Sequence, residues 1–401
     1  MVKRQQLIER YPIPWTEDQV AAFRRSLLAW YDQSGRDLPW RQDQDPYKIW
    51  VSEIMLQQTQ VATVIPYYYR FIEELPDVAA LAQADEDTLL GLWQGLGYYS
   101  RVKNMKVAAQ QIEADFAGEF PQDYQDLLTL KGIGPYTAGA IASIAFNQAE
   151  PAMDGNLIRI VSRLFEIEED VTLTAIQHKI RAYLYQLIDP ERPGDFNQAL
   201  MDMGAMVMTP HQDRPDPHPL KDFDQSYQHQ TSHLYPVKKA KLKASKHTYL
   251  AYVIQNAAGQ FLMRRHSDQE LLSGLWHFPL VEQDIVMETV SRGELIDPLW
   301  REFGQDLHAL GIKNEALKLL QNRNQYQQTD FNHYGQVKHV FSHRIWQCQL
   351  VPLILSTAEE MMDSVNWPRD FIWIDASKLD QIPISTLQKK LFQARLPFDP
   401  K

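Results

Sequence analysis

Apolar residues recur at helical spacing through about residue 208 of the chain. After Thr16, which forms a capping box with Gln19, the residues Val20, Phe23 and Leu27 fall on one face of a helix. A second helix begins where aspartate precedes proline at 45–46, and it carries the segment KIWVSEIMLQQ. The pattern predicts an all-α domain with further helices over about 60–74, 85–94, 100–115, 122–130, 136–147, 156–166, 173–188 and 195–208.

The pattern changes beyond this domain. Residues 209–247 show no recurrent apolar face and end in a lysine-rich run, which is typical of a loop and linker. From Thr248, short runs such as TYLAYVIQ and QFLMRR predict strands, with helices near 309–322 and 384–394. The predicted fold class is therefore multidomain, an all-α domain followed by an α+β domain. The expected boundaries are 1–225 for the helical domain, 226–247 for the linker and 248–401 for the second domain.

Composition narrows the possible functions. The 401 residues include no apolar run near the roughly 20 residues of a membrane helix, so we expect a cytoplasmic protein without a membrane segment. The one cysteine, Cys348, excludes an internal disulfide and a cysteine-ligated iron–sulfur cluster. The net charge of −11 argues against a generic polyanion binder, so any nucleic-acid site must be local.

The segment LKGIGPYTAGAIASIAF predicts two helices joined by a tight turn. Gly132 and Gly134 can take positive φ and let another backbone approach, while the next helix presents free N–H groups, so the pair suits a phosphate. A plain helix–turn–helix connection is the alternative. About twenty residues further on, Asp154 precedes another helix, whose dipole favours an ionised carboxylate.

Together these features resemble the helix-hairpin-helix superfamily of DNA glycosylases. The segments LPWR, PYKIWVSEIMLQQTQV, GLGYYSR, GPYTAG, MDGN and FNQALMDMGAMV are similar to adenine-DNA glycosylases of the MutY type over residues 20–210, and HVFSH continues the match. The resemblance implies a base excision repair enzyme that removes adenine mispaired with 8-oxoguanine. Its expected partner is double-stranded DNA containing that mispair, and we expect a monomer that acts in a bacterial cytoplasm.

Hydrolysis of an N-glycosidic bond needs an acid for the leaving base and a negative group beside the cationic sugar. Glu53 and Asp154 fit these two roles. Glu53 lies among Trp50, Ile54 and Met55, an apolar setting that raises the pKa of a carboxyl group. Without the resemblance, a surface glutamate is the favoured interpretation of Glu53, and a simple helix cap is the favoured interpretation of Asp154.

Tyr136 bears on the reaction subtype. Bifunctional relatives carry a lysine at this point of the hairpin, whose amine forms a Schiff base and leads to strand cleavage. A phenol here predicts a monofunctional hydrolase, although a tyrosine packed between helices is the alternative. The resemblance further assigns Asn156 to the catalytic site, Gln58 and Tyr98 to a wedge that enters the duplex, and Trp40, Arg41, Leu56 and Gln198 to the adenine pocket. Trp40 and Leu56 could instead be core, and Arg41, Gln58 and Gln198 ordinary solvated residues.

The chain departs from the family at its iron–sulfur region. Typical members carry cysteines spaced C-x6-C-x2-C-x5-C, and the equivalent positions here are Met208, Pro215, His218 and Asp224. We therefore expect a clusterless member without cofactor, in which catalysis persists. A substitute metal such as zinc is a less favoured alternative, with candidate ligands His211, Asp213, Asp216, His218 and Asp224.

The second domain resembles MutT/Nudix folds through GLWHFP and HVFSH. It lacks the clustered glutamates of a catalytic Nudix box, so nucleotide hydrolysis is not expected. Phe341, Ser342 and His343 match a loop that contacts 8-oxoguanine, where the Ser342 hydroxyl could bond the N7–H that guanine lacks. The same tripeptide could also lie in a loop without function.

Three questions stay open at this point. One is whether the lysine run contacts phosphates or is only a solvated linker; its residues include Lys238, Lys239, Lys241 and Lys243. The enzyme could remove another base, such as thymine opposite guanine. A noncatalytic lesion-binding protein of the same fold is a third possibility.

Overall fold

The computed structural model describes residues 4–210, 218–239, 244–256, 258–267, 269–283, 335–341, 344–354 and 368–394. The chain divides into two compact units. The first comprises Met1–Ala84 and Ser100–Lys241, and the second comprises Asp85–Tyr99 and Leu242–Lys401. A short segment from the helical half of the sequence, Asp85–Tyr99, thus groups with the second unit.

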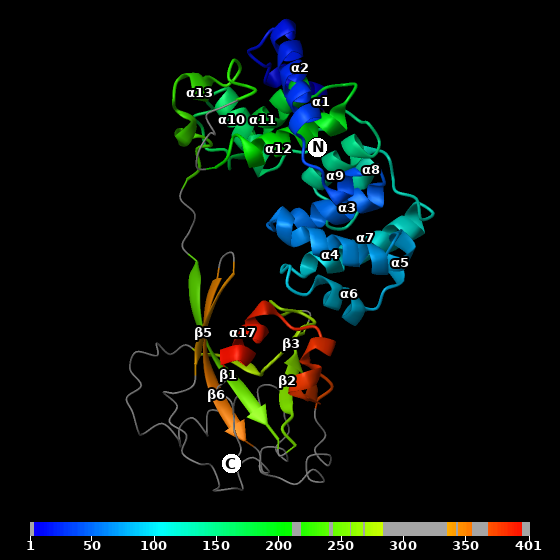
Figure 1. Ribbon diagram of the computed structural model, residues 1–401, viewed down its shortest axis with the longest axis vertical. Helices are drawn as coiled ribbons and strands as arrows, with labels where there is room; N and C mark the ends of the chain where they lie inside the picture. Colours follow the sequence, from blue (N-terminus) through cyan, green and yellow to red (C-terminus); the bar gives the residue numbers. More distant parts are fainter. Residues whose placement is uncertain are drawn as a thin grey trace. The chain divides into compact units, whose positions relative to one another are not determined.

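The first unit is built from helices (Figure 1). This confirms the all-α prediction, although α1, α5 and α13 were not predicted and α8 is shorter than expected. None of the described helices is long and apolar enough to cross a membrane. The helices are α1 (Arg4–Arg10), α2 (Glu17–Ser34), α3 (Pro46–Leu56), α4 (Val61–Glu74), α5 (Val78–Gln83), α7 (Ser100–Asp115), α8 (Tyr124–Leu127), α9 (Pro135–Ile144), α10 (Gly155–Leu164), α11 (Thr174–Leu187), α12 (Pro193–Met206) and α13 (Gln225–Gln228), with short 3₁₀ turns at Pro39–Arg41 and Ser232–Leu234.

Local capping explains where two of these helices begin. The Thr16 hydroxyl accepts a hydrogen bond from Gln19 N at 3.3 Å, and the Gln19 side chain accepts one from Thr16 N at 2.9 Å. The Asp45 carboxylate accepts from Tyr47 N at 2.9 Å, and Pro46 occupies the first helical position, where no N–H is needed. Each cap satisfies N–H groups that a helix start leaves without a partner.

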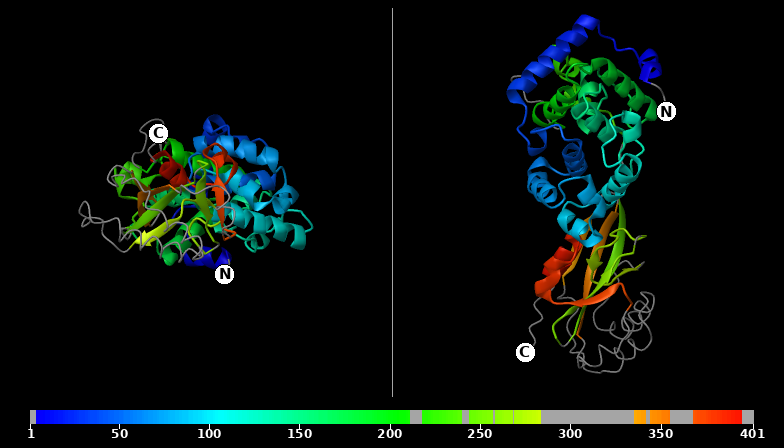
Figure 2. Two further views of the ribbon diagram at one scale, coloured as in Figure 1. Left: turned by 90° about the horizontal axis from the view of Figure 1, so that it is seen from below. Right: turned by 90° about the vertical axis from the view of Figure 1, so that its right-hand side faces the viewer.

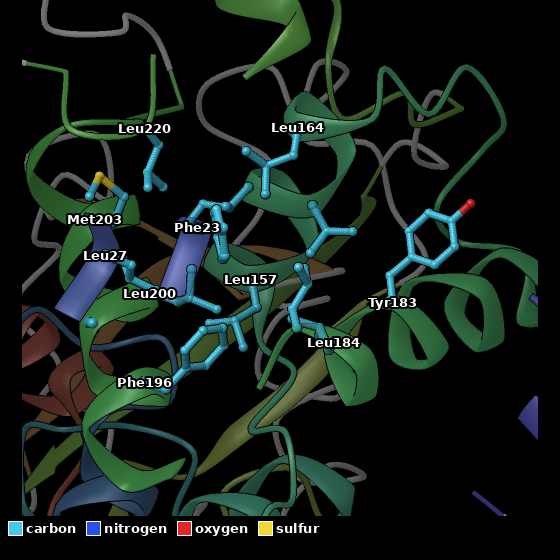
Figure 3. Packing of buried hydrophobic residues seen from close by; sticks show 14 of the residues in the cluster. Phe23, Leu27, Leu157, Leu164, Tyr183, Leu184, Phe196, Leu200, Met203 and Leu220 are labelled. Carbon is cyan, nitrogen blue, oxygen red and sulfur yellow. The ribbon is translucent and has the colours of Figure 1, made fainter. Parts of the chain in front are cut away.

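One apolar core joins α2, α10, α11 and α12 (Figure 3). Phe23 of α2, Leu157 of α10, Leu184 of α11 and Phe196 of α12 are fully buried in it. Burying such a side chain stabilises the fold by about 1.5–3 kcal/mol. The core therefore holds α10 and α12 in fixed positions relative to each other. Both helices contribute residues to the site described below.

The second unit contains a mixed sheet in the order β3-β2-β1-β6-β5, with β4 and β7 pairing β1 and β2. Helix α17 lies along one side of this sheet (Figure 2), and its Phe392 contacts Phe261 with ring centroids 5.5 Å apart. The α+β prediction is confirmed; the helix expected near 309–322 lies outside the described residues. The elements are α6 (Glu86–Trp93), β1 (Ser245–Gln255), β2 (Phe261–Arg265), β3 (Trp276–His277), β4 (Leu280–Gln283), β5 (Gln336–Val340), β6 (Arg344–Ile354), β7 (Phe371–Ile374), a 3₁₀ turn at Ala376–Gln381 and α17 (Thr386–Ala394).

The expected linker is bonded to the first unit over part of its length. Val237 O accepts a hydrogen bond from Val171 N at 3.0 Å, and Ser232 O accepts one from Arg163 Nε at 3.2 Å. Sequence polarity predicted a loop here, but backbone carbonyls can bind a folded surface whatever side chains they carry.

Candidate active site

A cavity of about 430 Å³ lies within the helical unit. Its size falls in the usual range for a small-molecule site, about 300–1,000 Å³. The walls come from the Pro39–Arg41 turn, α3, the start of α4, α9, the start of α10, and α12. All the residues assigned above to catalysis and to the adenine pocket line it: Trp40, Arg41, Glu53, Leu56, Tyr136, Asp154, Asn156 and Gln198.

Glu53 is buried, with 5% of its surface exposed, between Trp50 and Met55, which are fully buried. Burial raises the pKa of Glu53 to about 7; the nearby Asp154 charge acts in the same direction, and the Tyr136 hydroxyl and Arg41 oppose it. The Tyr136 hydroxyl donates a hydrogen bond to Glu53 Oε2. A carboxyl group with this pKa holds a proton in a large fraction of molecules at neutral pH, so it can act as a general acid.

Asp154 caps α10 and lines the cavity at the same time. Its Oδ1 accepts hydrogen bonds from Asn156 N and Leu157 N, both at 2.8 Å, and its Oδ2 accepts one from Asn156 Nδ2 at 2.7 Å. Burial raises the pKa of Asp154, and the three hydrogen bonds and the Arg159 charge reduce that rise. The helix start thus favours the ionised form of Asp154, as the sequence indicated. Desolvation is the larger effect, so the net shift of the Asp154 pKa is upward.

Arg159 holds Asn156 in place, a role that the sequence did not indicate. Its Nη2 donates to Asn156 Oδ1 and to Gly204 O, both at 2.7 Å. The close approach depends on Gly204, because a Cβ at that position would lie 2.7 Å from Asn156 Cβ. Arg159 of the same helix, α10, therefore orients the Asn156 amide and is itself anchored to the Gly204 carbonyl of α12, and Asn156 in turn bonds Asp154.

Asp202 is the main charged group of the cavity region that sequence reasoning missed. It is fully buried and accepts hydrogen bonds from Arg41 Nη1 at 2.8 Å, from Arg41 Nη2 at 2.9 Å and from Arg36 Nε at 2.8 Å. Burial acts to raise the pKa of Asp202, but the two guanidinium groups outweigh it and the net shift is downward. The available signal was its position four residues after Gln198, on the same face of α12.

The apolar side of the cavity is also rigidly held. Trp40 is 5% exposed and packs edge-on against Tyr68 with ring centroids 5.4 Å apart.

Asn197, which the sequence pattern did not single out, accepts from Ala152 N at 3.1 Å and donates to Ser143 Oγ at 2.8 Å. Asn197 therefore ties the segment before Asp154 to α9 and α12.

Gln58, Tyr98 and the hairpin glycines do not line the cavity. Gln58 and Tyr98 are exposed, and both have the left-handed backbone that non-glycine residues rarely adopt, with φ of 60° and 50°. Gly132 also has positive φ, 80°, and a Cβ there would lie 2.8 Å from Asn104 Cβ. Gly134 differs from the expectation: its φ is −94°, and it begins α9 without a side-chain cap.

Comparison with known proteins assigns the chain to a family. Residues 51–185 match the model of the HhH-GPD superfamily of base excision DNA repair proteins, and residues 250–394 match a NUDIX domain. The adenine DNA glycosylase of Mus musculus is 33% identical over 98% of this chain and 82% of its own length. The chain belongs to the adenine DNA glycosylase family. The human enzyme of that name is 32% identical over 94% of this chain and 74% of its own length, and a Buchnera aphidicola enzyme is 38% identical over 65% and 75%.

The chain departs from the cysteine spacing that the family resemblance implies, and the side chains present do not fit an iron–sulfur cluster. Met208, His218 and Asp224 offer no thiolate, and the single cysteine is buried in the other unit; Pro215 lies outside the described residues. His218 Nδ1 accepts from Leu220 N at 3.2 Å, which leaves Nε2 facing Asp224 Oδ2 at 3.4 Å. The described residues hold no group of three or more candidate metal ligands; His211, Asp213 and Asp216 lie outside them.

The predicted lesion-reading loop joins β5 and β6 of the glycosylase. Phe341 N donates to Arg344 O at 2.8 Å, and the Phe341 and Trp346 ring centroids are 4.9 Å apart. Ser342 and His343 lie outside the described residues, as do Lys241 and Lys243. Lys238 and Lys239 follow the hydrogen bond between Val171 and Val237 that attaches this stretch to the first unit.

Proposed function

We propose that this enzyme hydrolyses the N-glycosidic bond of adenine opposite 8-oxoguanine in duplex DNA and leaves an abasic site. The observation that carries the proposal is the pair of carboxyl groups in one cavity. Glu53 is set among apolar side chains with its pKa at about 7, whereas Asp154 accepts three hydrogen bonds at a helix start. Such a difference in setting is what separates an acid from a charge-stabilising carboxylate.

In the proposed reaction, Glu53 transfers its proton to N7 of the extruded adenine. The bond between C1′ and N9 breaks with its electron pair leaving on the base, and Asp154 stabilises the oxocarbenium ion that forms. Water then adds to C1′ and gives its proton to the Glu53 carboxylate, which restores the acid. A transient bond between Asp154 and C1′ is a variant of this route and gives retention at C1′.

Tyr136 supports hydrolysis without strand cleavage. Its phenol bonds Glu53 and offers no amine for a Schiff base. Trp40 and Leu56 supply apolar contact for the base, while Arg41, held by Asp202, and Gln198 supply polar contact to its edge. Gln58 and Tyr98 enter the duplex beside the lesion and help to offset the few kcal/mol that base flipping costs.

The test is single-turnover excision on a panel of duplexes carrying adenine opposite 8-oxoguanine, adenine opposite guanine, and thymine opposite guanine. We expect the wild type to act on the first two and to give strand breaks only after hot alkali, because an abasic site is the product. Glu53→Gln should bind the duplex and excise no base. Strand breaks without alkali would contradict a monofunctional enzyme, and duplex binding without any excision would favour the noncatalytic alternative.

Ser342 is proposed to read the lesion. One hydrogen bond to the N7–H of 8-oxoguanine is worth about 1–3 kcal/mol of discrimination, which corresponds to about 5- to 150-fold. Ser342→Ala should therefore reduce the preference for 8-oxoguanine over guanine while adenine excision continues. Ser267→Ala, the same change elsewhere in the second unit, is the control; an unchanged preference in Ser342→Ala would refute the role.

We also propose that the enzyme works without an iron–sulfur cluster or other metal, and that Lys238 and Lys239 contact phosphates. Metal analysis of the purified protein should find no stoichiometric metal, and chelation should leave excision unchanged. Replacing both lysines by alanine should reduce the slope of log binding constant against log salt by about 0.9 for each phosphate that is no longer neutralised. An unchanged slope would show that these lysines belong to a solvated linker and do not contact phosphates.

A further inference from the structure

Arg101, the last residue of the GLGYYSR motif, contacts the end of α3 from α7. Its Nη1 lies 2.5 Å from Ile54 O, 3.3 Å from Met55 O and 2.7 Å from Gln57 O. The carbonyls of a helix end have no partner within the helix, and a cation there also interacts favourably with the helix dipole. One side chain thus satisfies the end of α3 and the first loop residue after it.

The loop that Arg101 holds is the one that carries Gln58. The chain leaves α3 at Gln57, with φ −58° and ψ 111°, and turns into the left-handed region at Gln58, with φ 60°. A non-glycine residue in that region costs about 1–3 kcal/mol and persists only when the surroundings enforce it. The hydrogen bond to Gln57 O, one residue before the strained position, is a contact that enforces it.

Helix α7 also contacts the hairpin turn. Asn104 packs against Gly132 of the hairpin, where a Cβ would lie 2.8 Å away, and the Gln111 side chain accepts from Lys131 N at 2.7 Å. One helix, α7, therefore contacts both the loop after α3 and the hairpin turn. Such a shared support holds the two segments at a fixed spacing.

We propose that Arg101 is a positioning residue. It holds the loop after α3 in the conformation from which Gln58 enters the duplex. The inference rests on the proposed wedge role of Gln58 and adds to it the residue that makes the wedge rigid. Arg101 acts on extrusion of the base and not on bond cleavage, because the Glu53 carboxyl is held separately by Tyr136 of α9.

The experiment is a double-mutant cycle of Arg101→Met and Gln58→Ala, measured as the single-turnover excision rate on duplex with adenine opposite 8-oxoguanine. Each single variant should be slower by about 10- to 100-fold, the range expected when a group is misplaced by about 1 Å. The double variant should be no slower than the slower single variant, because Arg101 acts through Gln58. Multiplied effects would overturn the inference.

Two further measurements separate positioning from damage to the fold. In Arg101→Met, the descending limb of the excision rate against pH should stay near pH 7, because the surroundings of Glu53 are unchanged. A shifted limb would show that α3 itself has moved and would overturn the inference. Arg101→Lys should recover part of the rate, since an ammonium can still reach these carbonyls. Lys106→Met, which removes a cation from the same helix, is the matched control and should stay near the wild-type rate.

The outcomes distinguish this inference from the proposed function. No excision by the wild type contradicts the proposed function. Normal wild-type excision with an unaffected Gln58→Ala variant contradicts the wedge and, with it, the role of Arg101. Slow Gln58→Ala with a wild-type rate in Arg101→Met, confirmed as folded by circular dichroism, overturns only the inference about Arg101.

Discussion

Arg159 Nη2 donates a 2.7 Å hydrogen bond to Asn156 Oδ1, and Arg159 Nε donates one of 2.8 Å to Met208 O. Met208 is the residue that the family resemblance places at the first cluster position, whereas Asn156 bonds Asp154 in the cavity. The chain therefore keeps a short, hydrogen-bonded connection between the region that has no cluster ligands and the candidate active site. The backbone carbonyl of Met208 makes this connection, so it does not depend on what side chain occupies position 208.

Replacing Arg159 should reduce catalysis more than DNA affinity. Arg159→Met frees the Asn156 amide, and a misplaced catalytic group costs about 100-fold in rate. Arg159→Lys should not recover the rate, because an ammonium lacks the planar fork that binds Asn156 Oδ1 and Met208 O together. The measurements are single-turnover rate and duplex affinity. Arg192→Met, which removes a surface arginine paired with Asp32, is the control; equal losses in both variants would argue against a specific role.

Tyr136→Phe should move the pH dependence of excision upward. The Tyr136 hydroxyl lowers the pKa of Glu53 by bonding its carboxylate, so its removal raises that pKa further above about 7. The protonated acid then persists to higher pH, and the descending limb of the rate profile shifts in that direction. Tyr124→Phe, whose hydroxyl contacts Arg181 and not Glu53, is the control and should keep the wild-type limb. A downward shift in Tyr136→Phe would contradict the assignment.

Glu53→Gln should be more stable than the wild type at alkaline pH. The pKa of Glu53 is raised in the folded state from 4.5 to about 7, so its contribution to stability is complete below about pH 4.5 and is lost as pH rises through 7. The amide does not ionise, and at pH 8 it should gain up to about 3 kcal/mol in the free energy of unfolding. Urea unfolding at pH 4.5 and pH 8 measures this. The exposed Glu119→Gln should show no such pH-dependent gain.

The buried pair of His218 and Asp224 should couple energetically. Both side chains are fully shielded from solvent, and Asp224 also caps α13 through Tyr227 N at 3.1 Å. His218→Phe removes the 3.4 Å contact between His218 Nε2 and Asp224 Oδ2, so it should lower the free energy of unfolding by about 0.5–1.5 kcal/mol, the usual net value of one polar contact. Adding Asp224→Asn should cost less than it does alone. Asp222→Asn, at an exposed position nearby, serves as the control, and strictly additive effects would show that the pair does not interact.

Helix periodicity was sufficient to predict the all-α first unit, and the short strand-like runs were sufficient to predict the α+β second unit. The motif resemblance supplied eight of the residues that line the cavity. The residues alone left Glu53 open as a surface glutamate and Asp154 as a simple helix cap, and the motif resemblance assigned both to catalysis. Helices α1 and α5 were missed because they are short, and short helices owe their stability to packing more than to their own periodicity.

Asp202, Asn197, Arg159 and Arg101 could not be assigned roles in the same way. Each is one polar residue on a helix, and a solvated position would carry the same sequence signal. Their importance depends on partners 3 to 166 residues away: Asp202 bonds Arg36, Arg101 bonds the end of α3, and Arg159 bonds both Asn156 and Met208.

The sequence by itself determined most of the longer helices, the family and the chemical groups available for catalysis, because these follow from local periodicity, caps and motif spacing. Only the tertiary structure decided which of those groups share a cavity, that Glu53 is buried enough for its pKa to reach about 7, and which side chains hold it there. Desolvation and hydrogen bonding between distant segments depend on three-dimensional packing, and no local pattern of residues records them.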